Sequence, residues 1–377
     1  MLLFTFNIGV DDGSGLPTYS ESFMRNYKDK GISVINIIYD RHQDYRIEER
    51  EWQGKIWINC YLPRFLESFY ADLPNLIIDV IERDNITMII EPDYLMENYL
   101  EKCGLKQRGI KKILFVHLLY RGLMDCFTKE PYFQSHISTG MDYLATIAFL
   151  EWKAVMTCDT IICNSQFTRD QVERFYYDCN LQDKEIITAP LGIDVESVPY
   201  LPATDSGKWA YFGRLETQKG MVWLEKDFKL NPDSYLANPL LVCGAGSQDG
   251  KYMAAHMFDG FVDYRGNLKK EELWLVLCNV KYCIFPSIYE PWGLALTEAL
   301  AMGKICIISH KASGMLEQVE HMDNGLIFNF QKRSIVKYIE LLEGSDIDFD
   351  KMAARARQTS RTEKVHFEII DNIFLKG

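Results

Sequence analysis

Two glutamates, Glu290 and Glu298, flank a segment whose pattern predicts an anion-binding element. Lys281 to Pro286 predicts a buried strand, Ser287 to Gly293 a polar turn, and Leu294 to Met302 an amphipathic helix closed by Gly303. A helix N-terminus beside the carboxyl end of a strand presents free backbone N–H groups, which bind anions. Carboxylates repel a neighbouring phosphate but accept hydrogen bonds from sugar hydroxyls. The combination favours a sugar nucleotide as ligand.

Two glutamates at this spacing are, by themselves, typical of a solvated helix face. The residues around them are more specific, because the run SIYEPWGLALTEALAMG, from 287 to 303, resembles the paired-glutamate signature of the retaining family 4 glycosyltransferases. The resemblance implies that Glu290 lies at the donor sugar and that Glu298 binds the ribose hydroxyls of the nucleotide. The backbone amides from Trp292 through Gly293 to Leu294 are then expected to face the donor diphosphate.

A pair of cations follows another predicted strand, Lys208 to Phe212. Arg214 and Lys219 stand five residues apart in the run GRLETQKG, which begins at Gly213. Such a pair can place two positive charges on one diphosphate, with the arginine as a bidentate donor. A basic pair usually lies on the solvent-exposed surface and has no binding role, but this context resembles the diphosphate clamp of the same family.

A glycine-rich loop, from Gly9 to Pro17, separates a predicted first strand from a helix expected over Thr18 to Lys30. Such a loop is either a phosphate cradle or a simple tight turn. The family carries a glycine pair here that meets the donor diphosphate or the acceptor. This chain has Ser14 and Gly15 instead, so only Gly15 is carried over as a donor-site residue.

The run LVCGAGSQDG supports a competing hypothesis. Gly244, Gly246 and Gly250 follow a predicted strand, and Asp263 stands further on, as in a dinucleotide-binding fingerprint. That pattern alone would indicate a dehydrogenase. In the glycosyltransferase interpretation Gly244 lets the nucleotide approach, and Gly266 lies near its base.

His117 ends the predicted strand KILFVH, so its ring is expected at the carboxyl edge of a sheet. A histidine in that position is commonly structural. The family has a histidine at the corresponding strand end, beside the donor sugar, which implies a site role for His117. It would orient the donor or hydrogen-bond developing charge, since no partner acid follows it to activate it as a nucleophile.

Composition limits the class of protein. The chain has 377 residues, 47% of them hydrophobic, and its net charge is −12. Residues 1–200 hold 20 Lys and Arg against 30 Asp and Glu, which disfavours nucleic acid and anionic lipid as partners and favours a soluble acceptor that is neutral or cationic. The sequence shows no membrane-spanning run and no signal peptide. Ten scattered cysteines without CxxC pairs predict reduced thiols in the cytoplasm.

Alternating strands and helices predict an α/β protein with parallel sheets. The resemblance implies the GT-B architecture, in which two Rossmann-like domains face each other across a cleft. We expect an acceptor-side domain at 1–200, a nucleotide-sugar domain at 201–360, and a last helix at 361–377 that crosses back to the first domain.

The predicted function is transfer of a sugar from a nucleotide-sugar donor with retention of configuration. No cofactor and no protein metal site are expected, because the nucleotide sugar is a substrate and the histidines and cysteines show no ligand spacing. The alternatives are a sugar phosphorylase or a sugar-nucleotide epimerase of the same fold, or a non-catalytic sugar-nucleotide-binding subunit. The donor base and sugar, the acceptor, the linkage and the oligomeric state are left open.

Overall fold

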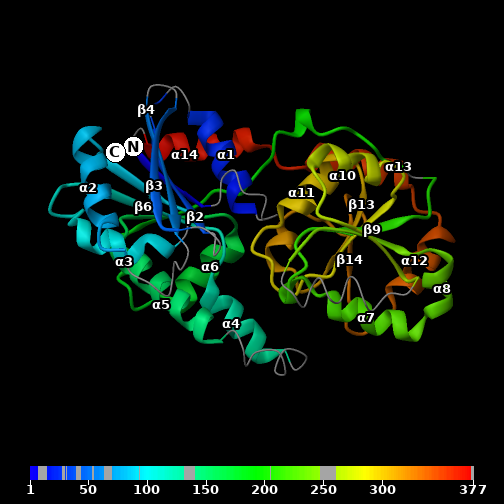
Figure 1. Cartoon of the computed structure of the whole chain (residues 1–377). Coiled ribbons are helices and arrows are strands. Elements are labelled where there is room, and N and C mark those ends of the chain that lie inside the picture. Colours follow the sequence, from blue (N-terminus) through cyan, green and yellow to red (C-terminus); the bar gives the residue numbers. More distant parts are fainter. Residues whose placement is uncertain are drawn as a thin grey trace. The chain divides into compact units, whose positions relative to one another are not determined.

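The computed structural model describes residues 1–6, 15–27, 30, 32–39, 44–52, 55–62, 70–92, 94–130, 141–203, 205–246 and 260–374. The chain divides into two compact units, Met1–Ala189 and Pro190–Gly377. Each unit is built around its own sheet (Figure 1). The prediction of two α/β units with parallel sheets is confirmed.

The first unit contains a sheet in the order β3-β4-β2-β1-β5-β6-β7-β8. Its strands are β1 (Leu2–Phe6), β2 (Ser33–Tyr39), β3 (Arg46–Trp52), β4 (Lys55–Leu62), β5 (Met88–Glu91), β6 (Lys111–Val116), β7 (Thr160–Cys163) and β8 (Glu185–Thr188). Its α-helices are α1 (Gly15–Tyr27), α2 (Leu73–Arg83), α3 (Glu97–Leu100), α4 (Tyr120–Lys129), α5 (Met141–Thr157) and α6 (Gln166–Phe175).

One strand of this sheet departs from the predicted pattern. β3 runs antiparallel to β4 at the sheet edge, where Arg46 pairs with Tyr61 and Trp52 with Lys55. Its sequence, RIEEREW, is rich in charge because an edge strand is exposed to water and charged side chains discourage pairing with other chains. The strand was not predicted from the sequence, because it contains no apolar run.

The core of the first unit lies on both faces of the sheet. Buried side chains of β1, β2, β4 and β5 pack against α2 and α3, and those of β6 and β7 against α5 and α6. On the other face Tyr19 and Phe23 of α1 contact Phe115 of β6, with ring centroids 5.6 Å and 6.1 Å apart. Successive strand residues point to opposite faces of the sheet, so Phe115 lies on the face opposite to the cluster that contains Leu114 and Val116.

The second unit contains a parallel sheet in the order β11-β10-β9-β12-β13-β14. Its strands are β9 (Trp209–Phe212), β10 (Leu240–Cys243), β11 (Val262–Gly266), β12 (Tyr282–Phe285), β13 (Ile305–Ser309) and β14 (Leu326–Phe328). Its α-helices are α7 (Met221–Leu230), α8 (Pro232–Ala237), α10 (Lys270–Leu277), α11 (Leu294–Ala301), α12 (Ile335–Glu343), α13 (Phe349–Thr359) and α14 (Glu363–Phe374). That α14 crosses back to the first domain stays a prediction.

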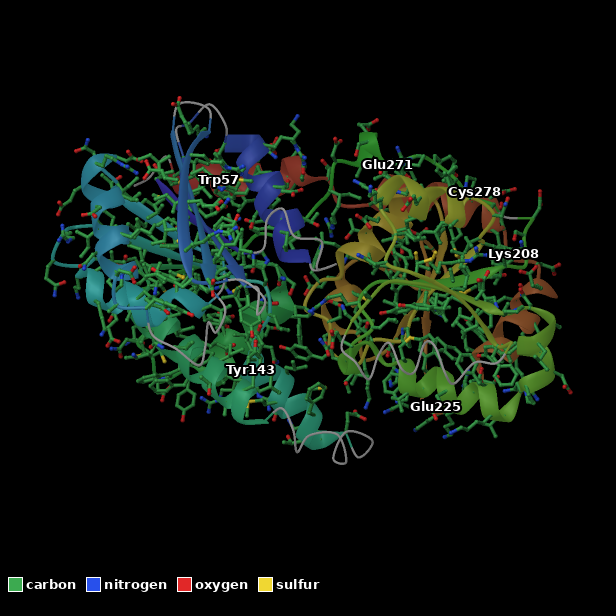
Figure 2. The ribbon with its side chains drawn as sticks, viewed as in Figure 1. Trp57, Tyr143, Lys208, Glu225, Glu271 and Cys278 are labelled. Atoms are coloured by element: carbon green, nitrogen blue, oxygen red, sulfur yellow. The ribbon has the colours of Figure 1, made fainter. Side chains whose placement is uncertain are left out.

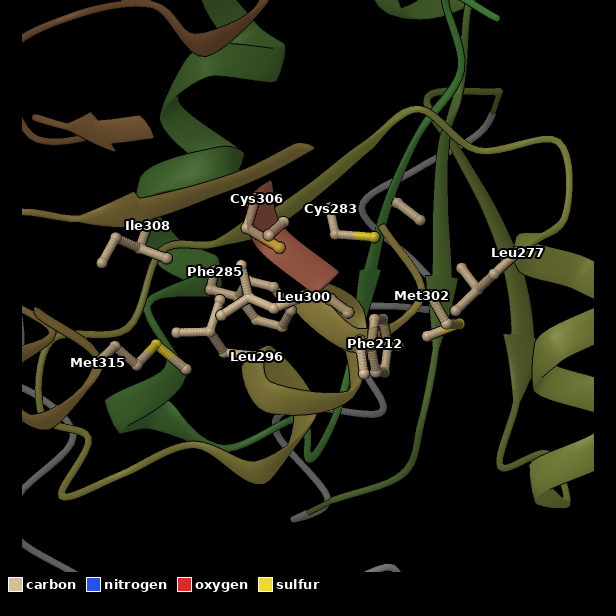
Figure 3. Close-up of a cluster of buried hydrophobic side chains, with 14 of the residues drawn as sticks. Phe212, Leu277, Cys283, Phe285, Leu296, Leu300, Met302, Cys306, Ile308 and Met315 are labelled. Atoms are coloured by element: carbon tan, nitrogen blue, oxygen red, sulfur yellow. The ribbon is translucent and has the colours of Figure 1, made fainter. Parts of the chain in front are cut away.

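Helices cover both faces of the second sheet. Figure 2 shows the side chains of Glu225 on α7 and Glu271 on α10 projecting on opposite sides of it. On the α10 face, Leu296 and Leu300 of α11 pack against Phe212 and Phe285 of the two central strands (Figure 3). This cluster fixes the helix against the sheet, and it therefore fixes where the N-terminus of α11 lies.

Two further features of the described residues bear on the class of protein. None of their helices combines the length and the apolar character that crossing a membrane requires. All ten cysteines lie in the described part of the chain and carry free thiols. Eight of them are buried, and burial raises the pKa of several, to about 12 for Cys60, Cys158 and Cys283.

Candidate functional site

The site in the second unit lies where the order of strands reverses. β9 and β12 are neighbours, yet the chain proceeds from β9 outward to β10 and β11, and from β12 outward to β13 and β14. Loops leaving the two central strands at their carboxyl ends therefore diverge and leave a crevice between them, which is the usual ligand position in such sheets. The predicted cations follow β9, and the predicted glutamates follow β12.

The loop after β9 is tied to its neighbours by backbone hydrogen bonds. The Leu215 amide donates to the Ala245 carbonyl at 2.9 Å, and the Ile288 amide donates to the Gln218 carbonyl at 2.8 Å. Gly220, with φ 75°, closes the 3₁₀ turn Thr217–Lys219, and a Cβ there would lie 2.0 Å from the Pro286 carbonyl oxygen. Only glycine permits this close approach, which joins the two loops of the site.

The turn after β12 leads into α11 with several amides unused. Gly293 is the N-cap of α11, and its carbonyl accepts from the amides of Leu296 and Thr297. Among the hydrogen bonds of the described residues, none has the amide of Gly293, Leu294 or Ala295 as donor. These three groups and the helix dipole present partial positive charge at the crevice.

The opposite side of the same turn is held by buried polar groups. The Gly314 amide donates to the Glu290 carbonyl at 2.9 Å, and the Gln318 Nε2 group donates to the Trp292 carbonyl at 2.8 Å. Thr297 of α11 completes the link, since its hydroxyl donates to Gln318 Oε1 at 2.8 Å. The turn that carries Glu290 is therefore fixed relative to the helix that carries Glu298. Gln318 was not predicted from the sequence, where nothing distinguishes it from a surface glutamine.

Charge is arranged unevenly in the crevice. Lys219 Nζ forms an ion pair with Glu290 Oε2, and their side chains are only 17% and 10% exposed. The Arg214 guanidinium, by contrast, has no ion pair or hydrogen bond within the part of the chain that the structure describes. The Lys219–Glu290 pair is neutral overall, so Arg214 and the free amides leave the site with a net attraction for an anion.

Glu298 stands apart from that ion pair. It lies half-buried on the second turn of α11, and burial raises the pKa of its carboxyl, with a smaller opposing effect from Lys270. Its carboxylate makes no hydrogen bond to any residue in the described ranges. A carboxyl that is partly shielded from water and has no donor among the described residues can accept hydrogen bonds from a ligand, as the ribose role requires.

The glycines after β10 have a structural explanation. A Cβ at Gly244 would lie 1.9 Å from the Gly213 carbonyl oxygen, and one at Gly246 would lie 2.1 Å from that of Leu215. Both glycines therefore let this loop pack against the one that carries Arg214. Gly266, with φ 71°, faces open space instead. The rest of the dinucleotide-like run, 247–250, lies outside the described residues, and Asp263 is paired with Arg265 at 2.7 Å.

The remaining two predicted site residues belong to the first unit. His117 directly follows β6, as expected, with its ring edge-on to Tyr19 at 4.5 Å between centroids. Its carbonyl accepts a hydrogen bond from Asn164 Nδ2 at 2.9 Å. Gly15 is the first residue of α1, and the loop that precedes it lies outside the described residues.

Tyr211 is a further residue at this site that sequence analysis missed. It is buried in β9, and its hydroxyl donates to the Arg214 carbonyl at 2.5 Å. Within a strand of apolar residues a tyrosine is ordinarily interpreted as core, so the only available signal was its position three residues before Arg214.

Comparisons with known proteins agree with this geometry. Residues 196–362 match the family model of glycosyl transferases group 1. An uncharacterized glycosyltransferase of Bacillus subtilis (strain 168) is 24% identical over 223 residues, which are 56% of this chain and 58% of that protein. O-antigen chain mannosyltransferase B of Escherichia coli is 24% identical over 169 residues, 41% of this chain and 44% of that protein. The chain thus spans about half the length of these curated relatives.

Solved structures show the same fold at low identity. Sucrose-phosphate synthase from Thermosynechococcus elongatus superposes with a TM-score of 0.75 at 16% identity and covers 100% of both chains. An Anabaena protein solved with UDP and glucose superposes with a TM-score of 0.68 at 14% identity, covering 99% of this chain and 98% of that one. The predicted GT-B fold is confirmed by these likenesses.

Proposed function

We propose that the chain is a retaining glycosyltransferase that uses a nucleotide-sugar donor, a proposal supported by the match of residues 196–362 to the family model of glycosyl transferases group 1. The observation that carries the proposal is the approach of the loop after β9 to the start of α11, where a Cβ at Gly213 would lie 4.0 Å from the Cβ of Ala295. Within the described residues, the Arg214 guanidinium of that loop has no ion pair or hydrogen bond, and the Lys219–Glu290 pair joins the same two segments. This arrangement offers positive charge for a diphosphate and a carboxylate for the sugar attached to it. The Anabaena structure contains ligands of this class, UDP and glucose.

Each residue then has a defined task. Arg214, Lys219 and the amides from Gly293 to Ala295 stabilise charge that develops on the departing diphosphate. The backbone that carries the amides is fixed before the reaction by its hydrogen bonds, so little reorganisation of these donors opposes it. Glu290 holds the sugar hydroxyls once the diphosphate engages Lys219, and Glu298 accepts the ribose hydroxyls. His117 orients the donor sugar from the first unit.

The transfer step follows from these positions. The bond between the anomeric carbon and the phosphate oxygen breaks, and the acceptor oxygen forms its bond to that carbon on the same face. The departing phosphate oxygen takes the acceptor proton, which balances the step without a protein nucleophile. Exclusion of water by domain closure would prevent hydrolysis of the donor.

The acceptor and compartment are proposed from charge and cysteine chemistry. The acidic composition of residues 1–200 favours a soluble acceptor that is neutral or cationic. Ten free thiols fit the reducing cytoplasm.

A thermal-shift screen tests which nucleotide the donor carries. The diphosphates of uridine, guanosine, adenosine and thymidine and their common sugar conjugates are added in turn, since a ligand that binds only the folded state raises the Tm. We expect a selective rise with one nucleotide, followed by sugar transfer from its conjugate. A rise with NAD and with none of the nucleoside diphosphates would contradict the proposal and favour the dehydrogenase alternative.

Reaction assays separate transfer from its alternatives within the fold. Phosphate-dependent breakdown of a disaccharide would indicate a phosphorylase, and conversion of the donor alone would indicate an epimerase. Donor binding without turnover across a broad acceptor panel would indicate a binding subunit.

A further inference from the structure

Tyr211 occupies a buried position directly beneath the loop that carries Arg214. It is the third residue of β9, and 1% of its surface is exposed. Successive side chains of a strand alternate between faces. Ala210 and Phe212 belong to the core cluster on the α10 and α11 face, whereas Trp209 packs on Tyr235 of α8. Tyr211 therefore points to the α8 side.

The hydroxyl of Tyr211 is committed to a single backbone group. It donates to the Arg214 carbonyl at 2.5 Å. Among the hydrogen bonds of the described residues, no other donor reaches that carbonyl. A Cβ at Gly213 would lie 3.5 Å from the same hydroxyl oxygen, so the loop rests directly on the tip of the ring. The bond fixes the peptide from which the Arg214 side chain departs.

The surroundings keep this hydroxyl a donor. Burial is the main cause that raises the pKa of Tyr211, the negative charge of Glu290 raises it further, and Arg214 opposes them. The phenol stays protonated at neutral pH, and its one proton is directed to the Arg214 carbonyl.

We propose that Tyr211 is a positioning residue for the diphosphate site, acting through Arg214. The inference rests on the proposed function. Its hydroxyl holds the Arg214 peptide so that the guanidinium, which has no partner within the described ranges, stays available for the terminal phosphate of a nucleoside diphosphate. Holding an unpaired arginine in place before the ligand arrives lowers the ordering cost of binding.

The test compares a nucleoside diphosphate with the matching monophosphate. The probe is whichever of the uridine, guanosine, adenosine and thymidine pairs binds the unmodified protein most tightly. For Tyr211→Phe, which keeps the ring, we expect the Kd of the diphosphate to rise about tenfold, the effect of losing one buried hydrogen bond. The Kd of the monophosphate should change little, because it lacks the group that Arg214 binds. KM for the donor should rise with it.

Tyr235→Phe is a matched control. Tyr235 is another fully buried tyrosine of the same unit, and its hydroxyl donates to Asp227 Oδ2 at 2.8 Å. Both variants lose one buried hydroxyl bond, but only Tyr211→Phe should change the ratio of the two Kd values. Equal ratios in the two variants would overturn the inference.

A double-mutant cycle separates this inference from the proposed function. Arg214→Ala alone should weaken binding of the diphosphate. Adding Tyr211→Phe to that variant should weaken binding no further, because both residues act through the Arg214 guanidinium. If Arg214→Ala leaves the ratio unchanged, the proposed function fails. If Arg214→Ala lowers diphosphate affinity but Tyr211→Phe lowers it equally with or without Arg214, only the role of Tyr211 fails.

Discussion

The two units treat their buried charges in opposite ways. In the first unit Lys112 lies between Glu91 and Glu97, all three side chains at most 4% exposed, and Lys112 also donates to the Thr157 hydroxyl at 3.0 Å. In the second, Lys219 meets Glu290 in a crevice, and neighbouring Arg214 has no partner within the described residues. Charges whose partners are all internal stabilise a fold. A cation without a protein partner at a strand switch point can instead bind an anionic ligand, as we propose for Arg214.

The largest effect on sugar transfer should follow removal of the two cations of the crevice, Arg214 and Lys219. The double variant Arg214→Ala, Lys219→Ala is expected to lower sugar transfer by about 10³-fold or more, because we propose that each removed group stabilises the departing diphosphate. Its Tm should stay close to that of the unmodified protein. Lys229→Ala is the control, since Lys229 is 72% exposed and forms an ion pair with Glu225 on its own helix. Near-normal turnover in the double variant would refute the assignment.

Removal of the buried Lys112 charge should instead lower the stability of the fold. Lys112→Met removes the buried cation that pairs with both Glu91 and Glu97, which should lower the free energy of unfolding by about 3–5 kcal/mol. Urea denaturation measures this. Lys129→Met is the matched control, because Lys129 is 59% exposed and pairs with Asp125 at 2.6 Å, and its loss should cost about 0.5 kcal/mol at most. Equal losses in the two variants would remove the distinction between the units.

Local patterns predicted the elements of the site well. The strand, turn and helix between 281 and 303 appear as β12, a turn and α11, because an apolar run, a proline, and a glycine at each end of the helix are all local signals. The same holds for β9 and the loop with Arg214. The charged edge strand β3 was missed, since its polarity reflects its place at the edge of the sheet.

Contacts between distant segments could not be predicted from one sequence. Gln318 holds the Trp292 carbonyl from 26 residues away, and Gly244 packs on Gly213 although the pattern around it is that of a nucleotide loop. Their roles depend on which loops the sheet order brings together. The role of Tyr211 could not be predicted for another reason. A buried tyrosine in a strand gives the same sequence pattern whether or not its hydroxyl holds a functional loop.

Glu290 allows a finer test of the open site. In the ligand-free protein Glu290 forms an ion pair with Lys219. Glu290→Gln should therefore release the lysine for the diphosphate and remove a negative charge that repels phosphate. We expect a nucleoside diphosphate to bind about two- to fivefold more tightly, the size of a partly exposed ion pair, while sugar transfer falls. Titration calorimetry and a transfer assay measure the two effects. Weaker binding of the diphosphate would show that Glu290 supports Lys219 instead of competing for it.

Glu298 provides the mildest test, through the pH dependence of stability. Burial raises the pKa of its carboxyl in the folded protein, so the folded state binds more protons than the unfolded state between the ordinary and the raised pKa. Stability must therefore fall as pH rises through that window. Glu298→Gln, which cannot ionise, should match the unmodified protein below the window and be more stable above it. Urea midpoints measured from acid to neutral pH check this. Parallel pH profiles would mean that Glu298 is already solvated, and its proposed contact with ribose would lose its physical basis.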